Sequence, residues 1–337
     1  MKEKALNVRL PRPSGRPFQG LLRISKPSIP ALILSCERSE ARTKAGLAAL
    51  LFLGLLDPAF SAPAAPAPAG AARDLAYGAY ERGDYRAAMA EAKKRVDANP
   101  RDAAALTLIG RLYLEGAGVK RDMKTAMSWF QRGAEAGGAE AAYLYGVASL
   151  EGIDIPKDHA RARAYLEKAG AQEHAAALHL LGELALENEG KDPDFAKAMG
   201  YFKRASAAGD PDADYAIGVL YKTGKGVEKD DRQAAEWFKR AADAGLAPAM
   251  VEYAIMQFNG TGVERDKTGA VDLLRKAALK GNPVAQNRLA HLYAEGLGVE
   301  VDLKAAREWR DKAKASGLND PSLDFLSNAP APQPAKK

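Results

Sequence analysis

The chain has few of the residues that disulfides and metal sites require. Its 337 residues include one cysteine, Cys36, and four histidines, His159, His174, His179 and His291. A single cysteine cannot form an internal disulfide, and the histidines do not cluster at the spacing of a metal-ligand set. The sequence therefore predicts no metal site and no cofactor.

Motifs of enzyme active sites are also missing. The chain has no Gly-x-Ser-x-Gly, no His-Glu-x-x-His and no phosphate loop ending in Gly-Lys-Ser/Thr. Lys-Thr-Gly occurs at 222–224 and 267–269, as in penicillin-interactive enzymes, but no Ser-x-x-Lys supplies a nucleophile. We expect no enzymatic activity; a cell-wall hydrolase or β-lactamase stays as an alternative that zymograms and nitrocefin would test.

Most of the chain lacks an excess of either charge. The net charge is +6, but residues 1–64 hold ten Lys/Arg and four Asp/Glu, so the remaining residues carry 39 of each sign. Binding to phosphates requires a basic surface on the folded domain itself. We therefore expect no nucleic-acid partner.

What the sequence does contain is a strict internal repeat. Six blocks of 36 residues follow one another over residues 103–318 without an insertion or a deletion. Positions 3 and 24 of each block are always alanine, and position 27 holds Trp, Tyr or Leu. Position 20 is always aspartate: Asp122, Asp158, Asp194, Asp230, Asp266 and Asp302. A fixed period of this length is typical of a repeat array.

Each block has the pattern of two amphipathic helices. In the first block, apolar residues recur at helical spacing over 106–113 and again over 126–134. Glycines such as Gly116 and Gly118 lie between the two helices, where positive φ ends a helix without a steric penalty. The aspartate that follows is expected to cap the second helix and is worth about 1 kcal/mol. Asp154 and Asn188 replace a loop glycine in blocks two and three, so we expect differently shaped connectors there.

The block sequence resembles the Sel-1-like repeat, a relative of the tetratricopeptide repeat. Residues 211–230 show the pattern best, followed by Ala234, Trp237 and Phe238. The resemblance implies an all-α fold, a right-handed superhelical solenoid of antiparallel helix pairs, in which neighbouring units supply one another's core. It also implies a protein-binding scaffold.

The flanking segments predict two caps and an exported protein. Residues 69–102 read as one tetratricopeptide-like cap repeat, and residues 319–337 as a C-terminal cap with a disordered tail, in which Leu323 to Leu326 close the last apolar face. Residues 42–64 have the basic, apolar and small-residue segments of a signal peptide, and 65–68 a Pro/Ala spacer. The apolar run is too short to span a bilayer, so we expect no membrane span in the mature chain.

Residues 1–41 fit that leader poorly. They form a long basic extension, expected to be disordered, ahead of the signal, and this suggests a mis-assigned start, although no methionine lies between Met1 and Met89. The leader predicts a periplasmic or secreted protein; a cytoplasmic location is the alternative if the leader is not used. Cys36 precedes the expected cleavage, so the mature chain would have no thiol.

Partner contacts are expected where the repeat varies on its concave face. In arrays of helix pairs the first helix of each unit usually lines that face, so positions 5, 9 and 12 are the candidates. The predicted contacts are Tyr143, Val147, Glu183, Tyr215, Val219, Ile255, Phe258 and His291. The alternative is that position 12 packs against the connector or the next unit, which leaves only positions 5 and 9 open.

These observations favour a scaffold that binds an unknown protein or peptide in the bacterial cell envelope. The runner-up is a binder of envelope glycan or cell-wall fragments, in which Tyr143 and Tyr215 would stack on sugars. A solvent-facing apolar stripe suits an extended or helical peptide better. The sequence does not specify the partner, because a repeat scaffold sets shape and its variable residues set the ligand.

Overall fold

The computed structural model describes residues 74–187 and 192–327. The expected extension, signal peptide and spacer lie outside these ranges, as do residues 69–73 and 328–337. Within the described ranges the regular structure is helical and contains no strand. No helix there is both long and apolar enough to cross a membrane.

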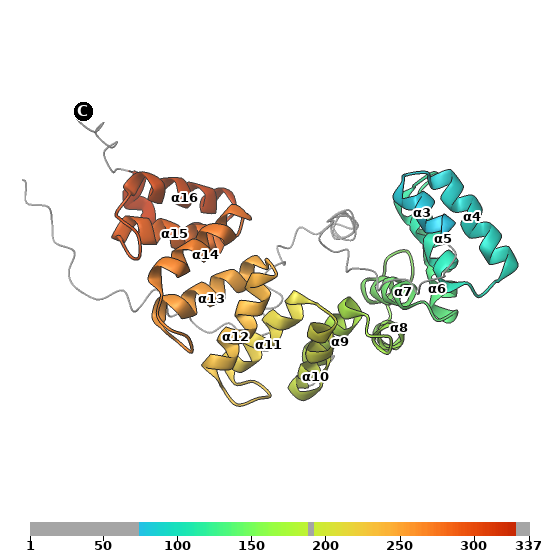
Figure 1. The fold of residues 1–337 in the computed structure, drawn as a ribbon, viewed down its shortest axis with the longest axis horizontal. Helices are drawn as coiled ribbons and strands as arrows, with labels where there is room; N and C mark the ends of the chain where they lie inside the picture. Colours follow the sequence, from blue (N-terminus) through green and yellow to red (C-terminus); the bar gives the residue numbers. More distant parts are fainter. Residues whose placement is uncertain (1–73, 188–191, 328–337) are drawn as a thin grey trace, which may run out of the picture. The chain divides into compact units, whose positions relative to one another are not determined.

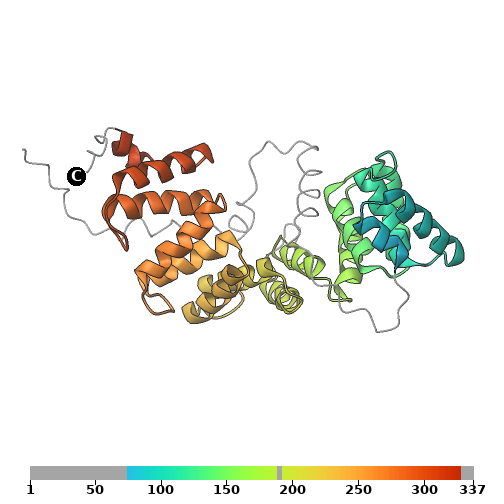
Figure 2. The same ribbon diagram turned by 45° about the horizontal axis from the view of Figure 1, so that its top comes forward.

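In the described part of the chain the helices form seven consecutive pairs and a final 3-10 helix, and Figure 1 and Figure 2 show them in chain order. They are α3 (Leu75–Glu81) with α4 (Tyr85–Ala98), α5 (Ala103–Glu115) with α6 (Met123–Glu135), α7 (Ala139–Glu151) with α8 (His159–Gly170), α9 (Ala175–Glu187) with α10 (Phe195–Ala207), α11 (Pro211–Thr223) with α12 (Asp231–Asp243), α13 (Ala247–Asn259) with α14 (Lys267–Leu279), α15 (Pro283–Glu295) with α16 (Leu303–Ala315), and η4 (Pro321–Ser327). Each helix packs on its pair partner and on the next helix along the chain. The expected all-α array of helix pairs is confirmed.

Small side chains set how closely the helices approach. The alanines at positions 3 and 24 are fully buried in all six units. Position 8 is glycine in the first four, and in α11 a Cβ built on Gly218 would lie 2.7 Å from Cδ1 of Phe238, which is itself fully buried. In the fifth unit the corresponding pair is Ala254 and Leu274. In the second unit glycine faces the smaller leucine, since a Cβ built on Gly146 would lie 2.9 Å from Cγ of Leu166. A small residue at position 8 therefore lets the helix that carries position 28 pack closely against it.

The connectors between the paired helices are held by the aspartate column. Each of the six aspartates is the N-cap of its helix; the Oδ1 atom of Asp122, for example, accepts a hydrogen bond from the N–H of Thr125 at 3.0 Å. Its own N–H donates back to the carbonyl of Tyr113 at 3.0 Å, and the other five aspartates make the same backbone bond. One residue therefore ties both ends of each connector together.

The connector of the second unit keeps the common form, contrary to expectation. Asp154 adopts a φ of +53°, in the left-handed region that glycine occupies in the first, fourth, fifth and sixth units, and Gly152 adopts +75°. Aspartate is among the few residues that tolerate this conformation. Asn188, in the third unit, lies outside the described residues.

At the C-terminus η4 covers the last unit. Leu323 and Leu326 are buried against Ala290, Ala306 and Trp309. Phe325 is 54% exposed, so the expectation that every apolar residue of 323–326 closes the last face is wrong for it. A 3-10 turn of three residues leaves only one side against the array.

Candidate functional site

The first helices of the units do not expose all the positions predicted to bind a partner. Leu114, Leu150 and Leu186, at position 12, are buried, as the alternative arrangement requires. Val219, at position 9 of α11, is only 3% exposed, so its place among the predicted contacts is wrong. Val219 is therefore part of the core in this unit.

His291 is the second correction. Its Nε2 atom lies 2.9 Å from Oδ2 of Asp320, and the same oxygen accepts a bond from Nδ2 of Asn287 at 3.0 Å. Asp320 belongs to the segment between α16 and η4. The chain's own C-terminal segment therefore covers the side chain that was expected to contact a partner.

The remaining candidates are half-buried. They are Tyr143, Val147, Glu183, Tyr215, Ile255 and Phe258. The two tyrosine rings are already engaged: Tyr143 stacks on His174 with ring centroids 4.8 Å apart, and Tyr215 lies 5.5 Å from the Phe238 ring. Val147 and Ile255 remain as the partly open apolar residues at position 9, with Phe258 beside Ile255 on α13.

Polar contacts between units interrupt the row of apolar residues along the first helices at α5 and α7. A hydrogen bond of 2.6 Å joins Nη2 of Arg111 to Oε1 of Glu140, and Nε2 of His174 lies 3.0 Å from the other carboxylate oxygen. Burial alone would raise the pKa of Glu140, but the His174 contact and the Arg111 charge outweigh it and lower this pKa to about 2. Burial, and then the Glu140 charge, raise the pKa of Tyr143 to about 12.

A second polar group lies between α9 and α11. Nδ1 of His179 is 3.0 Å from Oδ2 of Asp210, its Nε2 is 3.6 Å from Oε1 of Glu183, and its ring is 5.5 Å from that of Phe202. Burial opposes the charged imidazole, but the two carboxylates outweigh it and raise the pKa of His179 to about 10. Glu183 is thus partly committed to an ion pair within the array.

These contacts account for Glu140, His179 and His291 of the first helices as links between neighbouring units. The contact from position 9 to position 2 of the next unit occurs twice, as Arg111 to Glu140 and as His291 to Asp320, with the same separation of 29 residues. Asp320 therefore occupies position 2 of an incomplete seventh unit. No group of three or more potential metal ligands occurs in the described part of the chain.

Comparison with known families decides the identity of the repeat. A model described as the Sel1 repeat matches residues 103–138, 139–174, 175–210, 211–246, 247–282 and 283–318. The chain belongs to the Sel1 repeat family. The predicted 36-residue blocks have the same bounds, and the predicted resemblance is confirmed. Sel1 repeat proteins are generally scaffolds for protein interaction.

Two solved structures extend this result. The chain is similar to a Sel1 repeat protein from Oxalobacter formigenes, with 29% identity, a TM-score of 0.64, and coverage of 71% of this chain and 94% of that one. It is also similar to c5321, a protective antigen of uropathogenic Escherichia coli with the same fold, with 27% identity and a TM-score of 0.65. That match covers 72% of this chain and 52% of the antigen. Among curated proteins the comparison finds no match.

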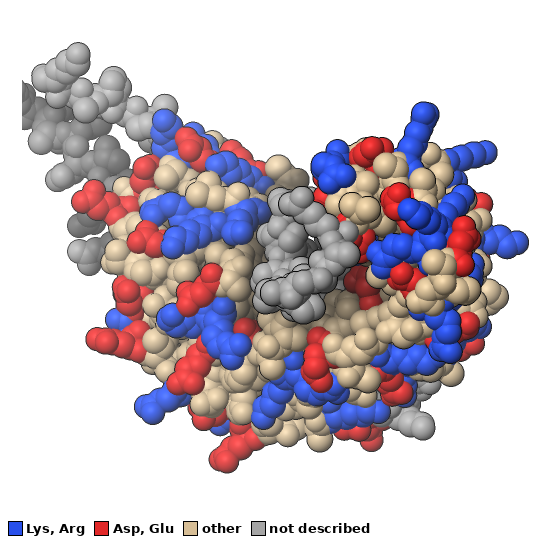
Figure 3. Space-filling model, turned by 45° about the vertical axis from the view of Figure 1, so that its right-hand side comes forward, with Lys and Arg blue, Asp and Glu red and all other residues tan. Residues whose placement is uncertain are grey.

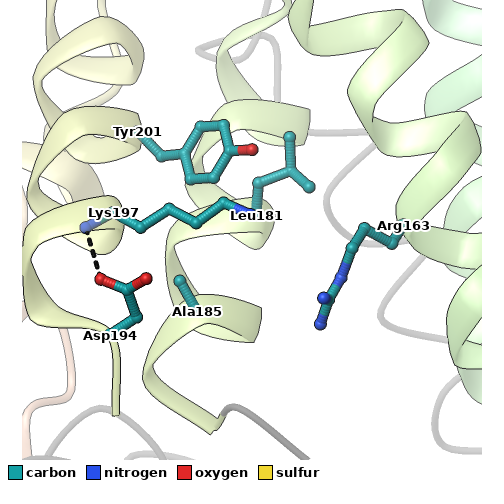
Figure 4. A pocket seen from close by; sticks show the side chains of 6 residues that line it. All are labelled: Arg163, Leu181, Ala185, Asp194, Lys197 and Tyr201. Carbon is teal, nitrogen blue, oxygen red and sulfur yellow. Dashed lines mark hydrogen bonds between the residues drawn. The ribbon is translucent and has the colours of Figure 1, made fainter.

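A hollow of about 70 Å³ lies between the second and third Sel1 repeats (Figure 4). Arg163 of α8, Leu181 and Ala185 of α9, and Asp194, Lys197 and Tyr201 at α10 line it. Its carboxylate is the helix cap, since Asp194 Oδ1 accepts the backbone N–H of Lys197 at 2.9 Å. The carboxylate of Asp194 therefore serves to cap α10. The residues around the hollow are those that meet where two repeats pack together, and they do not form an acid–base pair.

One recurring position of the Sel1 repeats was not identified from the sequence. Position 30, in the last turn of each second helix, is always basic: Arg132, Lys168, Arg204, Arg240, Lys276 and Lys312. In four units this cation lies over the ring at position 27, for example Arg132 at 4.3 Å from the Trp129 centroid. A cation there complements the helix dipole and the ring face. The same alignment that revealed the aspartates could have revealed this column.

The charges of the Sel1 array are mixed in sign. On the face drawn in Figure 3, basic and acidic side chains alternate over the described surface without forming a basic field. Many are paired locally, such as Lys239 with Asp243 at 2.7 Å. The face drawn therefore carries no basic field of the kind that a phosphate backbone requires.

Proposed function

We propose that the chain is a non-catalytic scaffold of the bacterial cell envelope that binds a protein or peptide partner along the first helices of its Sel1 repeats. The observation that supports this function is the half-buried apolar set Val147, Ile255 and Phe258 on a repeat of the interaction-scaffold type. Partly exposed apolar residues on a rigid array provide affinity for an extended or helical segment. Membership of the family also favours a role without catalysis.

The partner test uses charge substitutions on the open part of the stripe. Val147→Asp with Ile255→Asp should abolish capture of a partner from an envelope fraction, because the carboxylates would face an apolar segment. Val219 is left out because its substitution would damage the core. Leu279→Asp is the matched control, since Leu279 is 72% exposed at the end of α14, away from the first helices.

The outcome separates a binding surface from a structural one. Circular dichroism should show both proteins folded, and the double variant alone should lose the captured protein. Capture that survives the double substitution, or an unfolded double variant, contradicts the assigned surface. Turnover of nitrocefin or activity in a zymogram by the pure protein contradicts the non-catalytic role.

The glycan-binding alternative is less favoured. Both tyrosines that would stack on a sugar already lie against His174 and Phe238 within the array. Binding of purified muropeptides that is lost in Tyr143→Ala and Tyr215→Ala would reverse this preference.

Export is the remaining part of the proposal. The predicted signal at 42–64 would place the mature array in the periplasm or outside the cell, and its composition is the support for this location. N-terminal sequencing of the native protein from a periplasmic extract should begin near residue 65. Recovery of an uncleaved chain from the cytoplasm contradicts export.

A further inference from the structure

Three charged residues occupy columns of the repeat that are otherwise apolar and mostly buried. Position 6 is Leu108, Leu144, Leu180 and Ala216 in the first four units, but Glu252 and Arg288 in the last two. Position 12 is leucine in the first three units and Lys222 in the fourth. A break in the pattern at a position that packing otherwise controls is expected at functional sites.

These three residues belong to one cluster across α11, α13 and α15. The Nζ atom of Lys222 lies 2.5 Å from Oε2 of Glu252, whose side chain is only 14% exposed. The Glu252 charge also acts on Arg288, where it opposes the fall in pKa that burial causes. Lys222 is paired with Glu252, whereas the Glu252 charge acts on Arg288 without a salt bridge, and the three residues together carry a net charge of +1.

Arg288 is the member without a partner of its own. Its Nε atom is buried and has no hydrogen-bond partner, and the described residues provide no ion pair or hydrogen bond to its guanidinium. An arginine carries five N–H donors and stays charged at any physiological pH. A buried Nε–H without an acceptor is costly to hold in the folded state, so a ligand that supplies an acceptor would bind with little reorganisation.

The surroundings specify the chemistry of that ligand. The planar guanidinium fork matches a carboxylate, and the net positive charge of the cluster favours an anion. On α13, Ile255 follows Glu252 by one turn and Phe258 follows by another, and both are half-buried apolar residues. The same helix as Arg288 already holds one carboxylate from a non-helical segment, because Asn287 and His291 of α15 bind Asp320.

We propose that Arg288, supported by Lys222 across the Glu252 carboxylate, anchors a carboxylate of an extended peptide segment, with an apolar side chain of that segment against Ile255 and Phe258. This inference rests on the proposed function and names the chemistry of the partner. It assigns Arg288 to recognition of the ligand rather than to stability of the array.

The test is a nuclear magnetic resonance titration of the Arg288 Nε–Hε signal with three synthetic peptides. These are acetyl-Leu-Phe-Ala with a free C-terminal carboxylate, acetyl-Leu-Phe-Glu-amide, and the neutral acetyl-Leu-Phe-Gln-amide. We expect saturable binding of a carboxylate peptide on the order of tenfold tighter than the neutral peptide. The first two peptides distinguish a C-terminal carboxylate from a side-chain carboxylate.

Arg288→Leu is the decisive variant, because it restores the residue of the first three units. It should lose the preference for carboxylate, with affinity reduced about tenfold or more, while its melting temperature stays level or rises. Arg288→Lys keeps the charge without the fork and should bind with intermediate affinity. Lys239→Gln removes an exposed cation of α12 and should bind as the natural protein does.

Several results would overturn the proposal. They are equal binding of the neutral peptide, binding by Arg288→Leu at the natural affinity, no binding of any of the three peptides, or unfolding of Arg288→Leu. Capture of an envelope partner by natural protein and Arg288→Leu alike would remove this subsite and leave the proposed function standing. Binding of the carboxylate peptides by a protein that captures no envelope partner would leave this subsite standing and contradict the proposed function.

Discussion

At the scale of single residues, the fit between positions 8 and 28 sets the spacing within each helix pair. Glycine faces phenylalanine in three units and leucine in the second, and alanine faces leucine in the fifth. The missing Cβ of Gly218 is the space that the ring of Phe238 occupies. A substitution that adds one carbon there must displace a fully buried ring.

Gly218→Ala should therefore reduce the free energy of unfolding by about 1–3 kcal/mol, because overpacking a tight core forces side chains or backbone to shift. Gly200→Ala is the matched control. Gly200 is exposed on α10 with no atom within 4 Å of a built Cβ, so alanine there should stabilise the protein by about 0.5–1 kcal/mol. Urea denaturation measures both effects.

A second substitution tests the cause. Adding Phe238→Leu to Gly218→Ala recreates the Ala254 and Leu274 pair of the fifth unit, and the double variant should lose less stability than the two single losses combined. If the losses simply add, size matching is not the reason for the glycine column.

Two half-buried ionisable residues on the first helices make the stability of the fold decrease at both low and high pH. Folding lowers the pKa of Glu140 to about 2 from an ordinary 4.5, so its contribution is complete above about pH 4.5 and is lost as the pH falls toward 2. Folding raises the pKa of His179 to about 10 from 6.5, so its contribution is complete below about pH 6.5 and is lost as the pH rises toward 10.

Urea unfolding between pH 2.5 and pH 10 should give highest stability between these limits. Glu140→Gln should reduce the loss of stability at low pH, and His179→Asn should reduce the loss at high pH. Each substitution should leave the pH dependence in the other range unchanged. Glu236→Gln, an exposed carboxylate of α12, is the control and should change neither. A fall on the acid side that is as steep in Glu140→Gln as in the natural protein contradicts the assignment.

At the scale of elements, η4 replaces the first helix of a seventh unit. Leu323 and Leu326 are buried in the face that the following unit covers elsewhere in the array, and Arg307 Nε donates to the carbonyl of Leu326 at 2.8 Å. Arrays of this type require a terminal cap, because each unit leaves one apolar face for its neighbour.

Leu326→Ala should reduce the free energy of unfolding by about 2 kcal/mol, since it removes fully buried methyl groups. Phe325→Ala, in the same short helix but 54% exposed, should change it by at most about 0.5 kcal/mol. Thermal unfolding followed by circular dichroism compares the two. Equal effects would show that η4 does not cap the array.

At the scale of the whole molecule, the constant period of 36 residues means that the units make equivalent contacts with their neighbours. The separations of equivalent contacts repeat, as the 29 residues from Arg111 to Glu140 and from His291 to Asp320 show. Stability should therefore be a sum of units and junctions.

Deletion of residues 247–282, one complete unit, should leave a folded array with a lower melting temperature and a smaller urea m-value, because less surface is buried on folding. Deletion of residues 247–264, half a unit, joins two helices out of register and should give a poorly folded protein. Helical content by circular dichroism and the cooperativity of unfolding separate the cases. A cooperative, fully helical half-unit deletion would contradict the importance of the register.

The sequence by itself determined the period, the helix pairs and their ends, because these depend on local chemistry that recurs every 36 residues. Glycine permits the left-handed turn, aspartate caps the helix that follows, and alanine permits close approach. The column of cations at position 30 was also available in the alignment.

Only the tertiary structure decided which varying residues remain open. Val219 is buried and His291 is covered by the segment that carries Asp320, although both share position 9 with the half-buried Val147 and Ile255. Exposure at this position depends on the neighbouring unit and on the returning C-terminal segment, and these contacts join residues about 30 positions apart. Helical periodicity identifies the face on which a residue lies, whereas the side chains of adjacent units determine whether solvent or a partner can reach it.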